Sequence, residues 1–145
     1  MKICIVGGGN AAHTLAALFP YKGHETYVFA SYADEAERLK KGCDEQGGII
    51  ANFAAENTPS GEVKGTPKVI SKDAADVVPQ ADVLILPLPS FAYSPVLKSL
   101  KPHLRQGQFI GVTPGQGGFD WVAREELGEL AKSITFFAVM PMPFK

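Results

Sequence analysis

The sequence predicts an α/β fold: a doubly wound parallel sheet with a small hairpin insertion, formed as one domain over residues 1–145. Three observations predict it. Strand-like and helix-like segments alternate along the chain, which is the pattern of β-α-β units. The strand-like segments are nearly continuous apolar runs, as in parallel strands that helices cover on both faces. The first of these runs leads directly into three glycines and then into a helix-like segment.

The first strand and helix are the most clearly marked. Residues 2–6 (KICIV) are apolar and predict a buried strand. Residues 10–19 predict a helix with Asn10 as its N-cap, because asparagine is a preferred capping residue. Pro20 and Gly23 are expected to end this helix.

The next segments continue the alternation and then interrupt it. A second strand is predicted at 25–30 (ETYVFA), followed by a short helix at 34–41 (DEAERLKK). Its acidic residues come first and its basic residues last, as the helix dipole favours. Gly42 is expected to end the helix, which places Cys43 in a loop. Residues 47–66 contain a Pro-Ser-Gly turn signal between short strand-like pieces and predict a small hairpin.

The second half of the chain repeats the strand–helix pattern. The further strands are predicted at 68–71, 82–89, 108–114 and 133–139, and the helices at 73–80, 92–101 and 120–130. The run 82–89 (DVLILPLP) is the most hydrophobic segment, so it is expected to be a central strand. Ligands of such sheets bind at the carboxyl ends of the strands, so the loops that follow the strands are the candidate site.

The glycine loop after the first strand fits the pattern G-x-G-x-x-A. Gly7 would allow the tight turn, Gly9 would let the backbone approach a pyrophosphate, and Ala12 would let the helix pack close to the strand. Since the loop follows a strand and opens a helix, it predicts a Rossmann-type dinucleotide site, with a tight turn that binds nothing as the alternative. The predicted cofactor-binding residues of the loop are Gly7, Gly8, Gly9, Asn10, Ala11 and Ala12.

The residues after the second strand bear on the choice of nucleotide. An acidic residue about 20 positions after the glycines would bind the adenosine 2′-hydroxyl of NAD, but no acid stands at this strand's tip. Ser31 is predicted to bind a 2′-hydroxyl or a 2′-phosphate, and Arg38 is a candidate for the phosphate. The missing acid argues against FAD, and the residues alone leave NAD and NADP open.

Two more loops are expected at the nicotinamide half of the cofactor. The candidates are Pro87, Leu88, Pro89 and Ser90 after the central strand, and Thr113 after the following strand. The alternative is that their prolines and glycines serve only as turn residues.

Composition excludes several classes of function. The formal net charge is −1, so neither a nucleic acid nor a membrane surface is an expected partner. No apolar run reaches the roughly 18 residues of a membrane span. Cys4 and Cys43 form no metal-binding or CxxC pattern, which favours a reducing cytoplasm. No metal site or catalytic set is predicted, and His13 is interpreted as a structural histidine.

Five separated segments carry a resemblance to a known family: GGGNAAHTL, ADEAERL, PKVISKD, ADVLILPLPSFAY and TPGQGGFD. Together they resemble the N-terminal NAD-binding domain of the opine dehydrogenases, of the octopine dehydrogenase type, over roughly residues 3–120. The sequence is more distantly similar to glycerol-3-phosphate dehydrogenases and 2-dehydropantoate reductases, which share the cofactor fold.

The resemblance implies a reaction. A 2-oxo acid such as pyruvate condenses with the amino group of an amino acid, and hydride from NADH or NADPH reduces the imine. It favours NAD over NADP, assigns Gln116 to the substrate side, and places the catalytic residues in a C-terminal helical domain. The chain stops in the apolar run FFAVMPMPFK, so it is expected to be the front part of a longer protein. The alternatives are a reductase of the two similar families and a nucleotide-binding module without catalysis.

Overall fold

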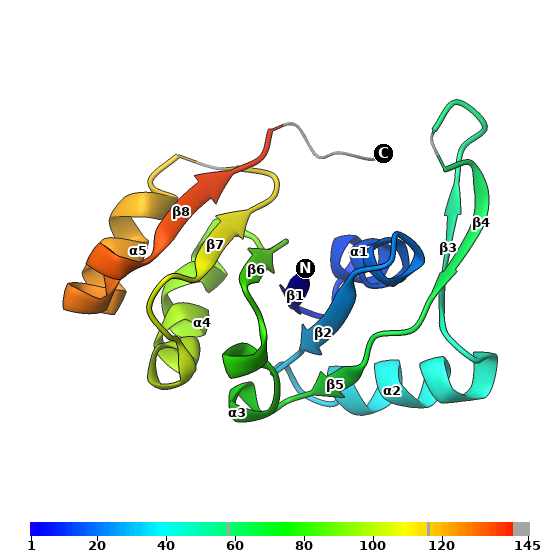
Figure 1. The fold of residues 1–145 in the computed structure, drawn as a ribbon, viewed down its shortest axis with the longest axis horizontal. Coiled ribbons are helices and arrows are strands. Elements are labelled where there is room, and N and C mark those ends of the chain that lie inside the picture. Colours follow the sequence, from blue (N-terminus) through cyan, green and yellow to red (C-terminus); the bar gives the residue numbers. More distant parts are fainter. Residues whose placement is uncertain (58, 116, 141–145) are drawn as a thin grey trace.

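The computed structural model describes residues 1–57, 59–115 and 117–140. Six parallel strands form one sheet in the order β5-β2-β1-β6-β7-β8, and β3 and β4 form a separate antiparallel pair (Figure 1). The strands of the large sheet are β1 (Lys2–Val6), β2 (Glu25–Phe29), β5 (Val69–Ser71), β6 (Val83–Leu86), β7 (Phe109–Val112) and β8 (Thr135–Ala138). The predicted fold class and the central position of the run at 82–89 are therefore confirmed.

Helices lie on both sides of the sheet (Figure 1). On one side α1 (Asn10–Tyr21) and α2 (Glu35–Gln46) bury small and aliphatic side chains against β1 and β2. On the other side are α3 (Ala74–Val77), α4 (Tyr93–Leu100) and α5 (Phe119–Leu127), together with the 3₁₀ turns η1 (Val78–Gln80), η2 (Ser90–Ala92), η3 (Lys101–His103) and η4 (Gly128–Ser133). None of the helices within the described ranges is long and apolar enough to cross a membrane.

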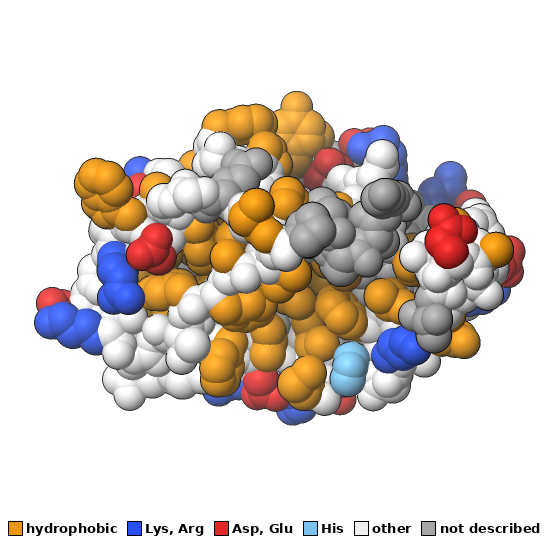
Figure 2. Space-filling model, turned by 90° about the horizontal axis from the view of Figure 1, so that it is seen from above, with side chains coloured by type: hydrophobic (Ala, Val, Ile, Leu, Met, Phe, Trp, Pro, Cys, Tyr) orange, Lys and Arg blue, Asp and Glu red, His pale blue; other side chains and the backbone are white. Residues whose placement is uncertain are grey.

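The expectation that helices cover both faces throughout is wrong for half of the sheet. In the described part of the chain, Ile85 is the one residue of β6–β8 that packs into the α1–α2 cluster. On the same face the Phe137 ring lies over Gly111, and Phe109 remains 45% exposed. Seen from above, hydrophobic side chains gather across the middle of the molecule and charged side chains lie around its rim (Figure 2).

The predicted hairpin is confirmed and packs on α1. It consists of β3 (Ile49–Phe53) and β4 (Gly61–Gly65), which pair antiparallel. Gly65 lies directly against the backbone of α1, since a Cβ added there would stand 2.0 Å from the carbonyl oxygen of Ala17. The close approach explains why glycine occupies the end of β4.

Helix α1 differs from the prediction at both ends. Gly9, not Asn10, is the N-cap, and Asn10 is the first helical residue. The helix also runs through Pro20 to Tyr21. A proline removes one backbone donor, so the carbonyl of Ala16, four residues earlier, receives no α-helical bond from residue 20.

Helix α2 is longer than predicted. It passes through Gly42 and ends at Gln46, and Gly47, with a φ of 67°, is its left-handed C-cap. Leu39 and Cys43 are both buried on its inner face, so their burial continues past Gly42 and offsets the roughly 1 kcal/mol that a helical glycine costs. The expectation that Cys43 lies in a loop is therefore wrong.

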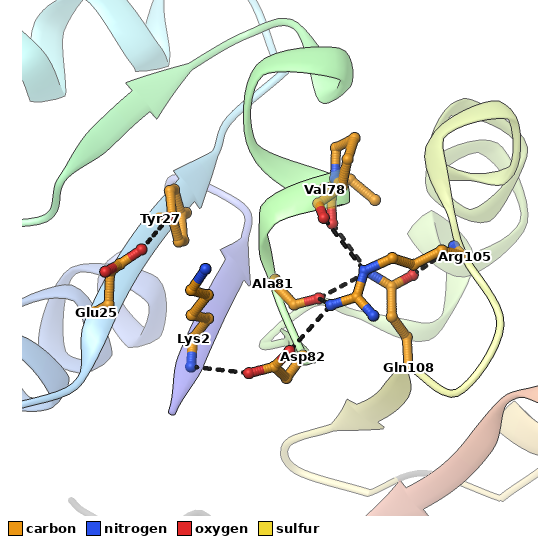
Figure 3. Close-up of polar contacts among 9 residues, drawn as sticks. Lys2, Glu25, Tyr27, Val78, Ala81, Asp82, Arg105 and Gln108 are labelled. Atoms are coloured by element: carbon orange, nitrogen blue, oxygen red, sulfur yellow. Dashed lines mark hydrogen bonds and ion pairs between the residues drawn. The ribbon is translucent and has the colours of Figure 1, made fainter.

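A polar network holds the edge of the sheet at which β6 and β7 begin (Figure 3). The fully buried Gln108 donates from Nε2 to the carbonyl oxygens of Val78 and Ala81 at 2.9 and 2.8 Å, and accepts from the Arg105 backbone N–H at 2.8 Å. Arg105 also donates to Ala81 and to the Asp82 carboxylate. These bonds satisfy the carbonyls of the turn before β6 and fix its start.

Candidate functional site

A cavity of about 600 Å³ opens at the carboxyl ends of β1, β2 and β6. That volume lies within the usual range for small-molecule sites. The residues that line it are Val6, Gly7, Gly8, Gly9, Phe29, Ser31, Tyr32, Glu35, Pro87, Leu88, Pro89, Phe91, Ala92, Pro95 and Val96. They come from segments far apart in the sequence, which the parallel sheet brings together at the carboxyl ends of its strands.

The cavity lies where the direction of winding changes. From β1 the chain proceeds outward to β2 and β5, and then returns to the other side of β1 to form β6, β7 and β8. The loops after β1 and β6 therefore diverge and leave a crevice between them. Ligands of open α/β sheets bind in such a crevice.

The glycine loop forms one wall of the crevice. Gly7 has a φ of 129°, which glycine adopts readily, and its N–H donates to the Phe29 carbonyl at 2.7 Å. A Cβ at Gly7 would lie 2.9 Å from the Leu88 side chain, whereas a Cβ at Gly9 would meet nothing within 4 Å. Gly9 therefore borders open space at the N-terminus of α1, where free N–H groups and the helix dipole favour an anion.

The opposite wall is apolar. Pro95 and Val96 line it from α4, and Phe91 and Ala92 from the turn before α4. Phe91 is 84% exposed, and Tyr32 at the end of the β2 side is 77% exposed. The wall formed by the glycine loop is thus suited to a phosphate, and the opposite wall is suited to a flat apolar ring.

The sequence-predicted residues fall into distinct places. Gly7, Gly8, Gly9, Ser31, Pro87, Leu88 and Pro89 all line the cavity. Ala12 is buried on the inner face of α1, and Thr113 is buried directly after β7. Asn10 and Ser90 are exposed and stand outside the lining, as does Ala11, while Gln116 lies outside the described residues.

Arg38 lies beside the cavity and not in its lining. It borders an adjoining depression with Gly8, His13 and Glu35, and its Nε is 3.0 Å from the Asp34 carboxylate. Whether it contacts a 2′-phosphate stays a prediction.

Eight lining residues were not predicted as site residues from the sequence: Val6, Phe29, Tyr32, Glu35, Phe91, Ala92, Pro95 and Val96. Phe91 stands in a loop that the sequence did single out. For Pro95 and Val96 the signal available was their position in the first turn of the helix after the central strand, where they face back toward the strand ends.

The described residues contain no evident acid–base or metal-binding set. They include no group of three or more His, Cys, Asp or Glu side chains placed to hold a metal ion. His13 contacts the Gly9 carbonyl through Nδ1 at 3.3 Å. Cys4 lies in β1 near the loop, but burial raises the pKa of its thiol to about 12, so it is no nucleophile at neutral pH.

Comparison with known proteins agrees with this geometry. Residues 2–115 match the family described as NADP oxidoreductase, coenzyme F420-dependent. The chain belongs to this family. The match spans every element from β1 to β7, and with it the whole lining of the cavity.

Within this family the chain is similar to opine dehydrogenases, which confirms the resemblance seen in the sequence. It is 37% identical over 147 residues to octopine dehydrogenase of Mizuhopecten yessoensis and 35% identical over 143 residues to tauropine dehydrogenase of Arabella iricolor. These alignments cover 99% and 98% of the chain, and the chain spans about 36% of the length of either relative.

Solved structures show the same relationship. The structure of octopine dehydrogenase with NADH and L-arginine superposes on the whole chain with a TM-score of 0.90 at 34% identity, and the chain covers 36% of it. The structure with NADH and pyruvate superposes with a TM-score of 0.88 at 32% identity, and this superposition also covers the whole chain. The Rossmann-type fold is therefore confirmed independently of the sequence pattern.

Proposed function

We propose that this chain is the cofactor-binding domain of an NAD-dependent opine dehydrogenase. The observation that carries the proposal is the cavity at the switch point of the sheet, with the glycine loop on one wall and an apolar surface on the other. The similarity to octopine dehydrogenases whose structures contain NADH supports it.

The residues present fit a nicotinamide dinucleotide. Backbone N–H groups after Gly9 would bind the pyrophosphate, because Gly9 carries no side chain into the open space there. The apolar side chains of Phe91, Pro95 and Val96 would hold the adenine ring. Leu88 and Thr113 follow the adjacent strands β6 and β7, toward the proposed nicotinamide half.

The chemistry that follows is a reductive condensation. The carbonyl of a 2-oxo acid and the amine of an amino acid lose water to form an imine, whose carbon accepts hydride. NADH supplies that hydride when bound. In this proposal the residues of this chain bind and orient the cofactor.

We propose further that a C-terminal domain of the same protein supplies the acid–base residues and most of the amino-acid site. The fraction of the relatives that the chain spans supports this proposal, as does the sheet face left uncovered by described residues at β6–β8. A pyruvate-like 2-oxo acid and an amino acid are the proposed substrates, Gln116 the proposed substrate-side residue, and the cytoplasm the proposed location.

The test is an assay of NADH oxidation by the protein extended beyond residue 145. NADH absorbance is followed with pyruvate alone, an amino acid alone, and pyruvate with arginine, taurine or alanine. Oxidation that requires both substrates is the expected result. Oxidation with the 2-oxo acid alone, at the same rate, would contradict the proposal and indicate a ketone reductase.

A further inference from the structure

The cavity contains a carboxylate that the glycine motif does not require. Glu35 is the one charged side chain among the described residues that line it. It comes from the first turn of α2, four residues beyond Ser31. The strand tip itself has no acidic residue, so Glu35 reaches the crevice from the helix that follows.

The carboxylate lies against the glycine loop. A Cβ added to Gly8 would stand 2.5 Å from Oε2 of Glu35 and 3.0 Å from its Cβ. The side chain therefore extends over Gly8 toward the space between the glycine loop and the end of β2, where Ser31 and Tyr32 also line the cavity.

The backbone before α2 directs Glu35 to this place. Ala33 has a φ of 46°, a left-handed conformation that is uncommon for a residue other than glycine. The turn brings the Glu35 N–H to the Tyr32 carbonyl at 3.1 Å. Helix α2 consequently begins with its first side chain facing the loop after β1.

Of the two charged side chains beside the glycine loop, Arg38 and Glu35, the structure pairs only Arg38 with another side chain among the described residues. Arg38 lies beside Glu35, but its Nε is paired with the Asp34 carboxylate at 3.0 Å. No ion pair or hydrogen bond joins the Glu35 carboxylate to another side chain in the part of the chain that the structure describes. The part of the cavity beside Gly8 and Ser31 therefore carries the Glu35 carboxylate, while the charge of Arg38 is paired with Asp34.

We propose that Glu35 selects NADH over NADPH by accepting hydrogen bonds from the adenosine ribose hydroxyls and repelling a 2′-phosphate. This inference rests on the proposed function, because it assigns the adenosine half of the same dinucleotide. A carboxylate accepts two hydroxyl donors well, and a like charge close by disfavours a phosphate dianion. The acid that the strand tip lacks is thus supplied by the first turn of α2.

The experiment measures dissociation constants for NADH and NADPH by calorimetry on the wild-type chain, Glu35→Gln and the control Glu45→Gln. Glu45 is on the same helix, is not among the residues that line the cavity, and its side chain is 65% exposed. The wild type is expected to bind NADH at least about tenfold more tightly than NADPH, the scale of one hydrogen bond to a charged group. In Glu35→Gln that ratio is expected to fall by about tenfold, whereas Glu45→Gln leaves it unchanged.

The outcomes separate this inference from the proposed function. A wild type that binds NADH and a Glu35→Gln variant that keeps the full NADH preference would overturn the role of Glu35 alone. Equal affinity of the wild type for both nucleotides would also overturn it and would favour Arg38 as a phosphate ligand. A wild type that binds neither nucleotide would overturn the proposed function together with the inference. Thermal unfolding of each variant confirms that it is folded.

Discussion

Replacing Gly9 with valine tests the placement of the pyrophosphate. The backbone at Gly9 has φ −77° and ψ 177°, which valine adopts without strain. A Cβ there meets no protein atom within 4 Å. Gly9→Val is therefore expected to keep the fold and to place its side chain in the space where the phosphates would lie.

The expected loss of affinity follows from the hydrogen bonds displaced. Two N–H donors to a charged phosphate contribute roughly 3–6 kcal/mol, so the dissociation constant for NADH should rise by about 100-fold or more. Replacing an N-cap glycine lowers the unfolding free energy by about 1 kcal/mol, partly offset by the reduced freedom of the unfolded chain. The melting temperature should therefore change by less than about 4 °C.

Gly7→Val is the matched control, because the same substitution two residues earlier is expected to lower the stability of the fold. Gly7 has a φ of 129°, and a Cβ there would stand 2.9 Å from Leu88 Cδ2. Strain of this kind costs about 1–3 kcal/mol before the steric contact is counted, so the melting temperature should fall by about 10 °C. NADH titration and thermal unfolding are measured on both variants. Normal NADH affinity in Gly9→Val, with the fold intact, would refute the placement of the cofactor.

Further predictions concern the apolar wall, the polar network, pH and the cysteines. Phe91→Ala should weaken NADH binding about two- to tenfold, as expected for the loss of one aromatic contact. Its melting temperature should be unchanged, because Phe91 is 84% exposed. Calorimetry measures the affinity, and a fall in stability instead would contradict the reasoning. Gln108→Leu should lower the unfolding free energy by about 2–4 kcal/mol in urea titrations, because buried carbonyls lose their donor; a loss below about 0.5 kcal/mol would refute its structural role. The hydrogen bond from Arg105 holds the pKa of the Asp82 carboxyl below its usual range. The stability that this carboxylate provides is therefore present above its unfolded-state pKa and is lost as pH falls through its folded-state pKa. Asp82→Asn should reduce the dependence of the unfolding free energy on pH below about pH 4. Because burial raises the pKa of Cys4 to about 12, a thiol reagent at pH 8 should modify Cys4 only in the unfolded chain, and rapid labelling of the native protein would contradict its burial.

The sequence was sufficient for the features that depend on local pattern. The glycine loop was predictable because its three glycines follow an apolar strand and open a helix, and each of them lines the cavity. The parallel order of the strands follows from apolar runs joined by helices. The hairpin at 47–66 was predictable from its turn residues and pairs as expected.

Other features depend on contacts between distant segments. Gly42 was expected to end α2, but the burial of Leu39 and Cys43 continues the helix to Gln46. The sequence shows that Glu35 begins a helix, yet only the turn at Ala33 directs its carboxylate to Gly8. Such directions depend on backbone geometry that no periodicity reveals.

The uncovered part of the sheet is a third difference of this kind. The apolar runs of β6–β8 predict cover on both faces, but helices cover only one face of these strands in the described residues. Periodicity indicates that a face is apolar and leaves open which segment packs on it.

The central claim is that this chain binds a nicotinamide dinucleotide at its glycine loop. The most direct test is a calorimetric titration of the 145-residue chain with NADH and, separately, with NADPH. The account predicts one-to-one binding of NADH with a clear preference over NADPH, and loss of that binding in Gly9→Val. No heat of binding with either nucleotide, for a chain shown to be folded, would contradict the account and leave the glycine loop as a turn.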